Sequence, residues 1–209
     1  FSKPVVATCD VHFLNPEEEI YTVSRKVGSV FQNPRSQFFC LDTSSELAFG
    51  CENLGMPVEQ INERVKYAAE ELELENLLDR DIFKLSGGEK QRIACGSVSA
   101  MLPDIIVLDE PTSNLDAESI ELLKRILALW KKQNKTIIIA EHRLYWLKDI
   151  CDRAVYLSDG KIQMDIPMRE LTDYSEQKME KLGLRSINAD FQSQINKSDW
   201  SPPSQNEPD

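Results

Sequence analysis

Two short, continuous apolar runs enclose a helix pattern in the second half of the chain. The runs cover residues 105–108 and 136–140, and neither alternates with polar residues as a half-exposed strand would. Between them, over residues 116–133, apolar residues recur at steps of three, four and three. This order of strand, helix and strand predicts an α/β domain in which helices cover a mostly parallel sheet.

Other segments fit the same architecture. We expect further strands at residues 5–11, 27–31, 154–157 and 161–165, and further helices at residues 57–78, 87–101 and 143–151. Asn15-Pro16 predicts another helix start, and Asp159-Gly160 predicts the turn of a hairpin between the last two strands. In an open α/β sheet, ligands bind beyond the carboxyl ends of the parallel strands.

Charge and composition exclude several function classes. The 209 residues suffice for a core without disulfides, and the five scattered cysteines indicate free thiols. The 24 basic and 35 acidic residues give a net charge of −11, which repels the phosphate backbone of nucleic acids. No apolar run approaches the roughly 20 residues that span a bilayer, so we expect any membrane association to be peripheral. Residues 186–209 are polar and hold three prolines, which predicts a disordered tail or linker.

Asp109 and Glu110 end the apolar run at 105–108. Two acids at this place are costly to hold near a core unless a cation or a positioned water compensates them. They are either an ordinary passage from strand to loop or a Mg²⁺ ligand beside a base that polarises water. The second arrangement is the one that phosphoryl transfer requires.

Ser86-Gly87-Gly88-Glu89 begins the helix pattern at residues 87–101. Ser86 with Glu89 three residues later is a capping box, which alone explains a helix start. A capping box needs no glycines, whereas two glycines let backbone N–H groups approach an anion at the positive end of a helix. A loop that binds phosphate therefore fits these residues better.

Gln32 and His142 also follow strand candidates, the strands at 27–31 and 136–140. Each is unremarkable by itself, because a loop glutamine is usually solvated and a lone histidine is usually a structural hydrogen-bonding residue. Their meaning depends on the other segments.

Taken in order, these segments resemble the ATP-binding domain of ATP-binding-cassette (ABC) proteins over residues 27–165. Gln32 matches the Q-loop, residues 85–92 the signature motif, residues 105–110 the Walker B strand, residues 113–116 the D-loop, and His142 the switch loop. Residues 31–34, 140–144, 152–153 and 159–162 further resemble the ATPase subunits of energy-coupling-factor importers, which take up vitamins and transition metals.

The resemblance implies roles for single residues. Catalysis would involve Glu110, which polarises the attacking water, and His142, which senses the γ-phosphate. Mg²⁺ would be held by Asp109, and Gln32 would link the metal and the water to a transmembrane partner. In a head-to-tail dimer, the signature loop would contact the γ-phosphate held by the other subunit through Ser86, Gly87 and Gly88. Asp116 of the D-loop would organise the interface between the two subunits.

The resemblance also implies cofactors, partners and location. ATP and Mg²⁺ would bind between two ABC ATPase subunits, identical or different, which would energise an importer through its transmembrane subunits. No nucleic acid would bind, and the chain would sit peripherally at the cytoplasmic face of the cell membrane. Residues 1–185 would form the ATP-binding domain, with a helical subdomain at about 40–102.

One departure keeps alternatives open. The family's phosphate-cradling G-x-x-x-x-G-K-[ST] loop does not precede Gln32, where Gly28 is the one glycine, so we expect a domain that is incomplete at its N-terminus. Such a chain could be a catalytically incompetent module that donates its signature loop to a partner's ATP. A soluble ABC ATPase outside transport is a further alternative. The charge of −11 and the lack of a long insertion between Gln32 and Ser86 weigh against it.

Overall fold

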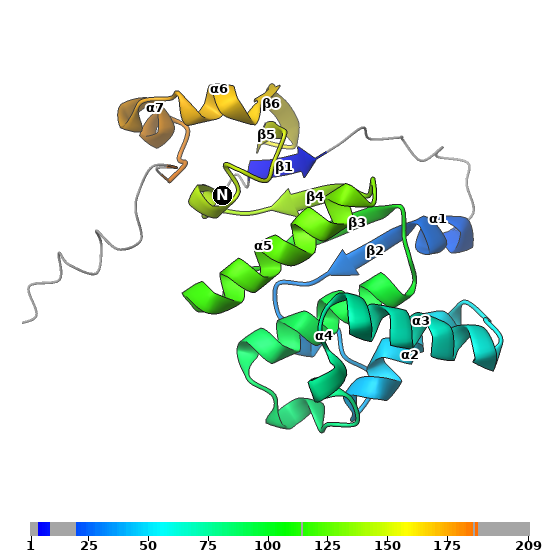
Figure 1. Ribbon diagram of the computed structural model, residues 1–209. Coiled ribbons are helices and arrows are strands. Elements are labelled where there is room, and N and C mark those ends of the chain that lie inside the picture. Colours follow the sequence, from blue (N-terminus) through cyan, green and yellow to red (C-terminus); the bar gives the residue numbers. More distant parts are fainter. Residues whose placement is uncertain (1–3, 9–19, 114, 186, 188–209) are drawn as a thin grey trace, which may run out of the picture.

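The computed structural model describes residues 4–8, 20–113, 115–185 and 187, and Figure 1 shows how the elements are arranged. The strands are β1 (Pro4–Thr8), β2 (Val27–Val30), β3 (Ile105–Asp109), β4 (Thr136–Ala140), β5 (Arg153–Ser158) and β6 (Lys161–Pro167). The α-helices are α1 (Ile20–Lys26), α2 (Thr43–Asn53), α3 (Val58–Glu71), α4 (Gly87–Ala100), α5 (Ala117–Lys132), α6 (Met168–Thr172) and α7 (Glu176–Lys181). Short 3₁₀ turns cover Pro34–Ser36, Glu75–Leu77, Ile82–Lys84 and Leu144–Trp146.

The described strands form one sheet in the order β2-β3-β4-β1-β5-β6. The pairs β2–β3 and β3–β4 are parallel, with Val30 beside Leu108 and Asp109 beside Ala140. Strand β1 is antiparallel to both β4 and β5, and β5 and β6 form the expected hairpin. The expected mostly parallel sheet is therefore parallel only from β2 to β4. That is the half of the sheet from which the candidate site residues extend.

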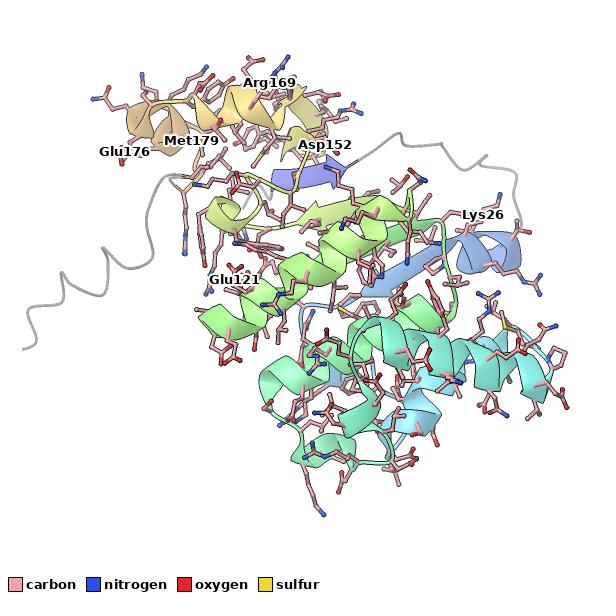
Figure 2. All side chains as sticks on the ribbon, in the orientation of Figure 1. Lys26, Glu121, Asp152, Arg169, Glu176 and Met179 are labelled. Atoms are coloured by element: carbon pink, nitrogen blue, oxygen red, sulfur yellow. The ribbon has the colours of Figure 1, made fainter. Side chains whose placement is uncertain are left out.

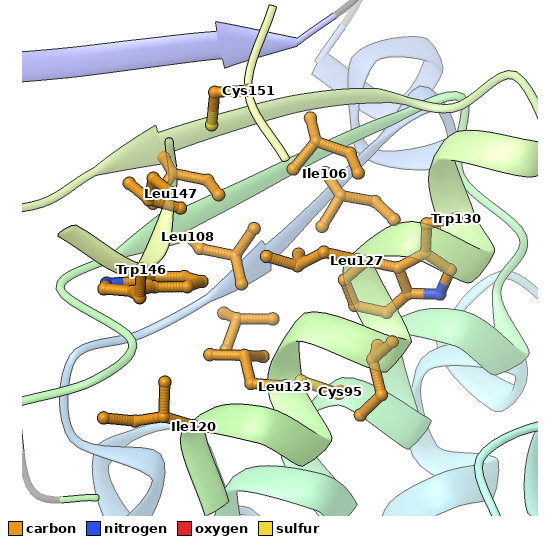
Figure 3. Packing of buried hydrophobic residues seen from close by; sticks show 14 of the residues in the cluster. Cys95, Ile106, Leu108, Ile120, Leu123, Leu127, Trp130, Trp146, Leu147 and Cys151 are labelled. Atoms are coloured by element: carbon orange, nitrogen blue, oxygen red, sulfur yellow. The ribbon is translucent and has the colours of Figure 1, made fainter. Parts of the chain in front are cut away.

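Helix α5 packs across the sheet and supplies much of the core. Figure 3 shows Leu127 and Trp130 of α5 facing Ile106 and Leu108 of β3, and all four side chains are buried. The step of three to four residues between buried positions on α5 matches the sequence pattern. Burial of this apolar face holds α5, and with it the loop between β3 and α5, in a fixed place.

Helices α2, α3 and α4 form a layer beside the β2 edge of the sheet (Figure 1). They pack against one another, and α4 also contacts β2. Leu47 of α2 and Leu74 and Leu77 of the segment after α3 are fully buried between them. This layer carries the N-terminal end of α4 toward the loops that follow β2 and β3.

Two expected helices differ in the structure. The helix expected at 57–78 ends at Glu71, because Glu73 adopts a left-handed backbone conformation with φ of 55°. The helix expected at 143–151 is wrong: the segment forms only the 3₁₀ turn Leu144–Trp146 and a further tight turn. Bonds within this segment run from the amide of Leu147 to the carbonyl of Leu144 and from the amide of Ile150 to the carbonyl of Leu147, so they close 3₁₀-type turns in place of α-helical ones. The rest of the segment is too short to sustain a helix alone.

Other expectations are met or fall outside the described chain. Residues 15–16 and the expected tail at 186–209 lie outside it, except for Ile187, which is buried. Helix α1 (Ile20–Lys26) lies directly downstream of the helix start expected at residues 15–16. On α7, Met179 is buried and Glu176 is exposed (Figure 2). Within the described residues, no helix is long and apolar enough to cross a membrane, and four cysteines are free thiols, namely Cys40, Cys51, Cys95 and Cys151.

Candidate functional site

Glu110 lies between Gln32 and His142. The amide nitrogen Nε2 of Gln32 donates to Oε2 of Glu110 at 2.7 Å, and Nε2 of His142 lies 3.0 Å from Oε1 of the same carboxylate. The side chain of Glu110 is 15% exposed and that of His142 is 41% exposed. The three predicted residues therefore meet around one carboxylate at the molecular surface.

Strand topology explains why residues so far apart in sequence meet. Gln32 follows β2, Glu110 follows β3 and His142 follows β4, and these three strands are parallel neighbours. Parallel neighbours end at the same edge of a sheet. The loops that leave them therefore begin within a few ångströms of one another.

The backbone at Glu110 is held in an unusual conformation. Its φ of 42° lies in the left-handed region, which costs a non-glycine residue energy. Its amide donates to the carbonyl of Ala140 at 2.7 Å, and its own carbonyl accepts from the amide of Ser113 at 3.1 Å. These bonds turn the chain sharply after β3 and aim the carboxylate across the ends of the strands.

Asp109 precedes Glu110 at the end of β3, and its side chain is exposed. In the described part of the chain, no group of three or more histidine, cysteine, aspartate or glutamate side chains is gathered to hold a metal. The oxygen donors here are thus few and exposed. They suit a hard cation that completes its shell with water and ligand oxygens, as Mg²⁺ does, rather than one enclosed by protein.

The Ser86-Gly87-Gly88 loop forms a complete capping box at the start of α4. Ser86 accepts from the amide of Glu89 at 3.3 Å, and the Glu89 carboxylate accepts from the amide of Ser86 at 2.8 Å. These bonds and the nearby Arg80 lower the pKa of Glu89. The capping box predicted from the sequence is therefore present. Phosphate binding by this loop stays a prediction.

Gly88 and Asp116 both lie next to Ser119. A Cβ on Gly88 would lie 2.2 Å from Oγ of Ser119, so the start of α4 packs directly on the first turn of α5. Asp116 is the N-cap of α5 and accepts from the amide of Ser119 at 2.8 Å. Hydrogen bonds from the side chain and the amide of Ser119 lower the pKa of Asp116. The signature segment and the D-loop segment thus form one surface.

A cavity of about 340 Å³ lies beside two of the predicted residues, Gln32 and Gly87. Pro111 and Leu115, from the loop between β3 and α5, also line it. The loop after β2 and the start of α4 therefore face one cavity.

Two residues in this region were not identified from the sequence as part of the site. Glu141, between β4 and His142, is 2% exposed and bonds to Thr112 in the loop after β3. Ser119 lies in the first turn of α5, where a serine gives no signal of its own in the sequence. The signal for Glu141 was an acid directly after a buried strand, which is the same signal that identified Asp109 and Glu110.

Known proteins have sequences similar to that of this chain. The family model described as ABC transporter matches residues 7–113. A putative ABC transporter ATP-binding protein of Treponema denticola is 49% identical over 179 residues, covering 85% of this chain and 37% of the relative. One from Pyrococcus furiosus is 43% identical over 141 residues, covering 68% of this chain and 54% of the relative. The chain thus spans about a third to a half of these relatives' length.

Two solved structures share the fold. CbiO1 from Clostridium perfringens, part of the ABC transporter complex CbiONQ, has a TM-score of 0.66 and 28% sequence identity, covering 78% of this chain and 67% of that one. The ATP-binding cassette MJ0796, a dimer in a post-hydrolysis state bound to ADP and Pi, has a TM-score of 0.62 and 25% identity, covering 75% and 68%. The expected fold class is confirmed.

Proposed function

Because this chain belongs to the ABC transporter family, we propose that it is the ATP-binding and ATP-hydrolysing part of an importer of the energy-coupling-factor type. The observation that carries the proposal is the carboxylate of Glu110 between Gln32 and His142. A carboxylate oxygen accepts two hydrogen bonds, so an oxygen bonded to Gln32 or His142 retains capacity for a water molecule. Glu110 then orients and polarises the water that attacks the γ-phosphate.

His142 and Gln32 serve the same step from either side of Glu110. Nε2 of His142 is within hydrogen-bond distance of Glu110, and 41% exposure of the side chain lets it turn toward a phosphate oxygen. Gln32 fixes the second oxygen of Glu110 through its amide nitrogen. That bond leaves the amide carbonyl of Gln32 as the atom suited to a hard cation.

Mg²⁺ fits the oxygen donors of Asp109 and Gln32. When bound, the ion neutralises charge that develops on the phosphate oxygens. Asp109 is the exposed last residue of β3, and the pairing of β3 with β2 and β4 fixes the position of its backbone. Asp109 therefore holds the ion, while Glu110 acts on the water.

The loop of Ser86, Gly87 and Gly88 completes the ATP site of a second subunit. The capping box fixes the backbone at the start of α4, whose N-terminal end favours anions. Asp116, joined to Gly88 through Ser119, organises the same surface. The dimer neighbour MJ0796, bound to ADP and Pi, supports a dimer here as well.

Transmembrane subunits are the second class of partner. Phe31 is 48% exposed and directly precedes Gln32, so an apolar contact at Phe31 would reach Glu110 through Gln32 alone. The CbiO1 neighbour, part of a transporter complex, supports such partners. We place the protein at the cytoplasmic face of the membrane, bound through these subunits.

ATP turnover of the full-length gene product tests the proposal. Glu110→Gln should lower kcat about 10²- to 10⁴-fold, because it removes the base and keeps the shape of the side chain. Glu121→Gln, an exposed acid on α5, is the matched control and should keep the wild-type rate. Wild-type turnover no faster than that of Glu110→Gln would contradict ATP hydrolysis.

A second variant tests the dimer. Ser86→Arg should stop turnover, because Ser86 acts on the ATP of the other subunit. It should leave the affinity of the full-length gene product for ATP within about threefold. Importer function is tested by co-purification with membrane subunits and by their stimulation of turnover.

A further inference from the structure

We propose that Glu141, acting with Thr112, is a positioning residue that sets His142 against Glu110. The inference rests on the proposed function, since it concerns the same reaction. It adds a buried carboxylate that acts through the two loops to which it bonds.

The carboxylate of Glu141 holds the backbone that carries His142. Its Oε1 accepts from the amide of His142 at 2.8 Å and from the amide of Arg143 at 3.0 Å. These bonds close a tight turn directly after β4. The direction in which His142 leaves the sheet therefore depends on the side chain of Glu141.

The other oxygen of Glu141 reaches the loop that carries Glu110. Its Oε2 accepts from the hydroxyl of Thr112 at 2.5 Å, and Thr112 is fully buried. The carbonyl of Thr112 accepts from Nη1 of Arg143 at 3.4 Å, and the amide of Glu110 donates to Ala140. Together with the contact between Glu110 and His142, these bonds join the loop after β3 to the end of β4 and to the loop that follows it. The distance between His142 and Glu110 therefore depends on these bonds.

Because the carboxylate of Glu141 is buried, it requires hydrogen-bond donors from the protein. Glu141 is 2% exposed, and in the described part of the chain it forms no ion pair. A buried carboxylate is tolerated only when hydrogen bonds replace the water that it loses. All the donors that replace this water belong to the loops carrying Glu110 and His142. Any movement of one loop relative to the other weakens them.

Removal of the carboxylate should affect the rate and spare binding. Glu141→Ala frees the turn that carries His142, so we expect kcat for ATP to fall about tenfold or more. KM should stay within about twofold, because Glu141 is too buried to contact the nucleotide. Glu141→Gln keeps the oxygen that accepts the two amides and can donate to Thr112. We expect it to restore most of the rate.

Glu46 offers a matched control. It is also 2% exposed, and its Oε2 accepts from the amides of Phe39 and Cys40, both at 2.9 Å. It lies on α2, in the helical layer, and contacts neither the loop after β3 nor the loop after β4; Phe39 and Cys40 stand at the far end of the loop after β2, next to α2. Glu46→Ala should lose stability as Glu141→Ala does, but its kcat per folded molecule should stay at the wild-type value.

The experiment measures kcat and KM for ATP in the full-length gene product, with each rate divided by the folded fraction from circular dichroism. Hydrogen exchange of the His142 and Arg143 amides is followed in the same variants. Lower kcat, unchanged KM, faster exchange in Glu141→Ala and recovery in Glu141→Gln support the inference. Thr112→Val should lower kcat less, and adding it to Glu141→Ala should cost little more.

Two outcomes would overturn the inference, and they can be told apart. If wild type is active and Glu141→Ala matches it per folded molecule, or Glu141→Gln is no better than alanine, the positioning role alone is wrong. If wild type hydrolyses ATP no faster than Glu110→Gln, the proposed function falls, and the inference falls with it.

Discussion

Gln32 donates its amide nitrogen to the carboxylate of Glu110 at 2.7 Å, across 78 residues of sequence. This bond connects the loop after β2 to the loop after β3. A change in the position of Gln32 is thus transmitted directly to the proposed base.

Gln32→Ala should lower ATP turnover about tenfold or more, because Glu110 loses a partner that orients it. Gln32→Glu should be worse, since a second carboxylate beside Glu110 repels it and favours its protonated form. The measurement is steady-state phosphate release. Gln163→Ala, at an exposed glutamine on β6, is the control. Full activity in Gln32→Glu would contradict the role of this contact.

Gly28→Ala should destabilise the fold by about 1–3 kcal/mol through overpacking. A Cβ at Gly28 would lie 2.4 Å from Cγ1 of Val98 on α4 and 3.0 Å from Cγ of Pro103. Val98→Ala removes the closest of these atoms, so the double variant should lose less than the two single losses combined. Urea unfolding measures each loss, and exposed Ser29→Ala should change little. Strict additivity would contradict the predicted clash.

The folded chain should protect two cysteines from alkylation. Burial raises the pKa of Cys95 and of Cys151 to about 12, so at pH 8 only about one thiol in 10⁴ is ionised. Among the cysteines that the structure describes, Cys40 is partly exposed, and we expect iodoacetamide to modify it before Cys95 and Cys151. Mass spectrometry of the labelled protein, with and without denaturant, checks the order. Equal rates for Cys95 and Cys40 in the folded protein would contradict it.

Asp116 should make stability depend on pH in the acid range. Hydrogen bonds from Ser119 lower its pKa in the folded chain. Its stabilising contribution is therefore complete above the unfolded pKa of about 3.9, and it is lost as pH falls through the lower folded pKa. Asn also caps helices, so Asp116→Asn isolates the charge. Wild type should exceed this variant in urea midpoint at pH 6, and the gap should close near pH 2.

Strong apolar periodicity made part of the fold predictable. Strands β3 and β4 and helix α5 lie within about one residue of their expected ends, because each buries a continuous or periodic apolar face. The end of α3 was not predictable, since Glu73 takes a conformation that usually marks glycine or asparagine. The helix expected at 143–151 is absent because the segment closes i→i−3 turns, and apolar periodicity does not distinguish these from α-helical turns.

The part of the candidate site whose residues are brought together by the strand topology was predictable from the sequence. Gln32, Glu110 and His142 each follow a strand, and parallel strands bring such residues together. The bond between Glu141 and Thr112 spans 29 residues and joins two loops. It depends on the direction of single side chains, and the sequence pattern carries no information about that direction.

Glu110 also has a consequence for protein engineering. Its backbone φ of 42° is one that glycine adopts without strain and glutamate does not. Sequence design aimed at stability alone would favour glycine there, and the product would fold without the carboxylate on which hydrolysis is proposed to depend. Stability and activity are therefore in direct conflict at this residue, and any thermostabilised version of the chain should keep it fixed.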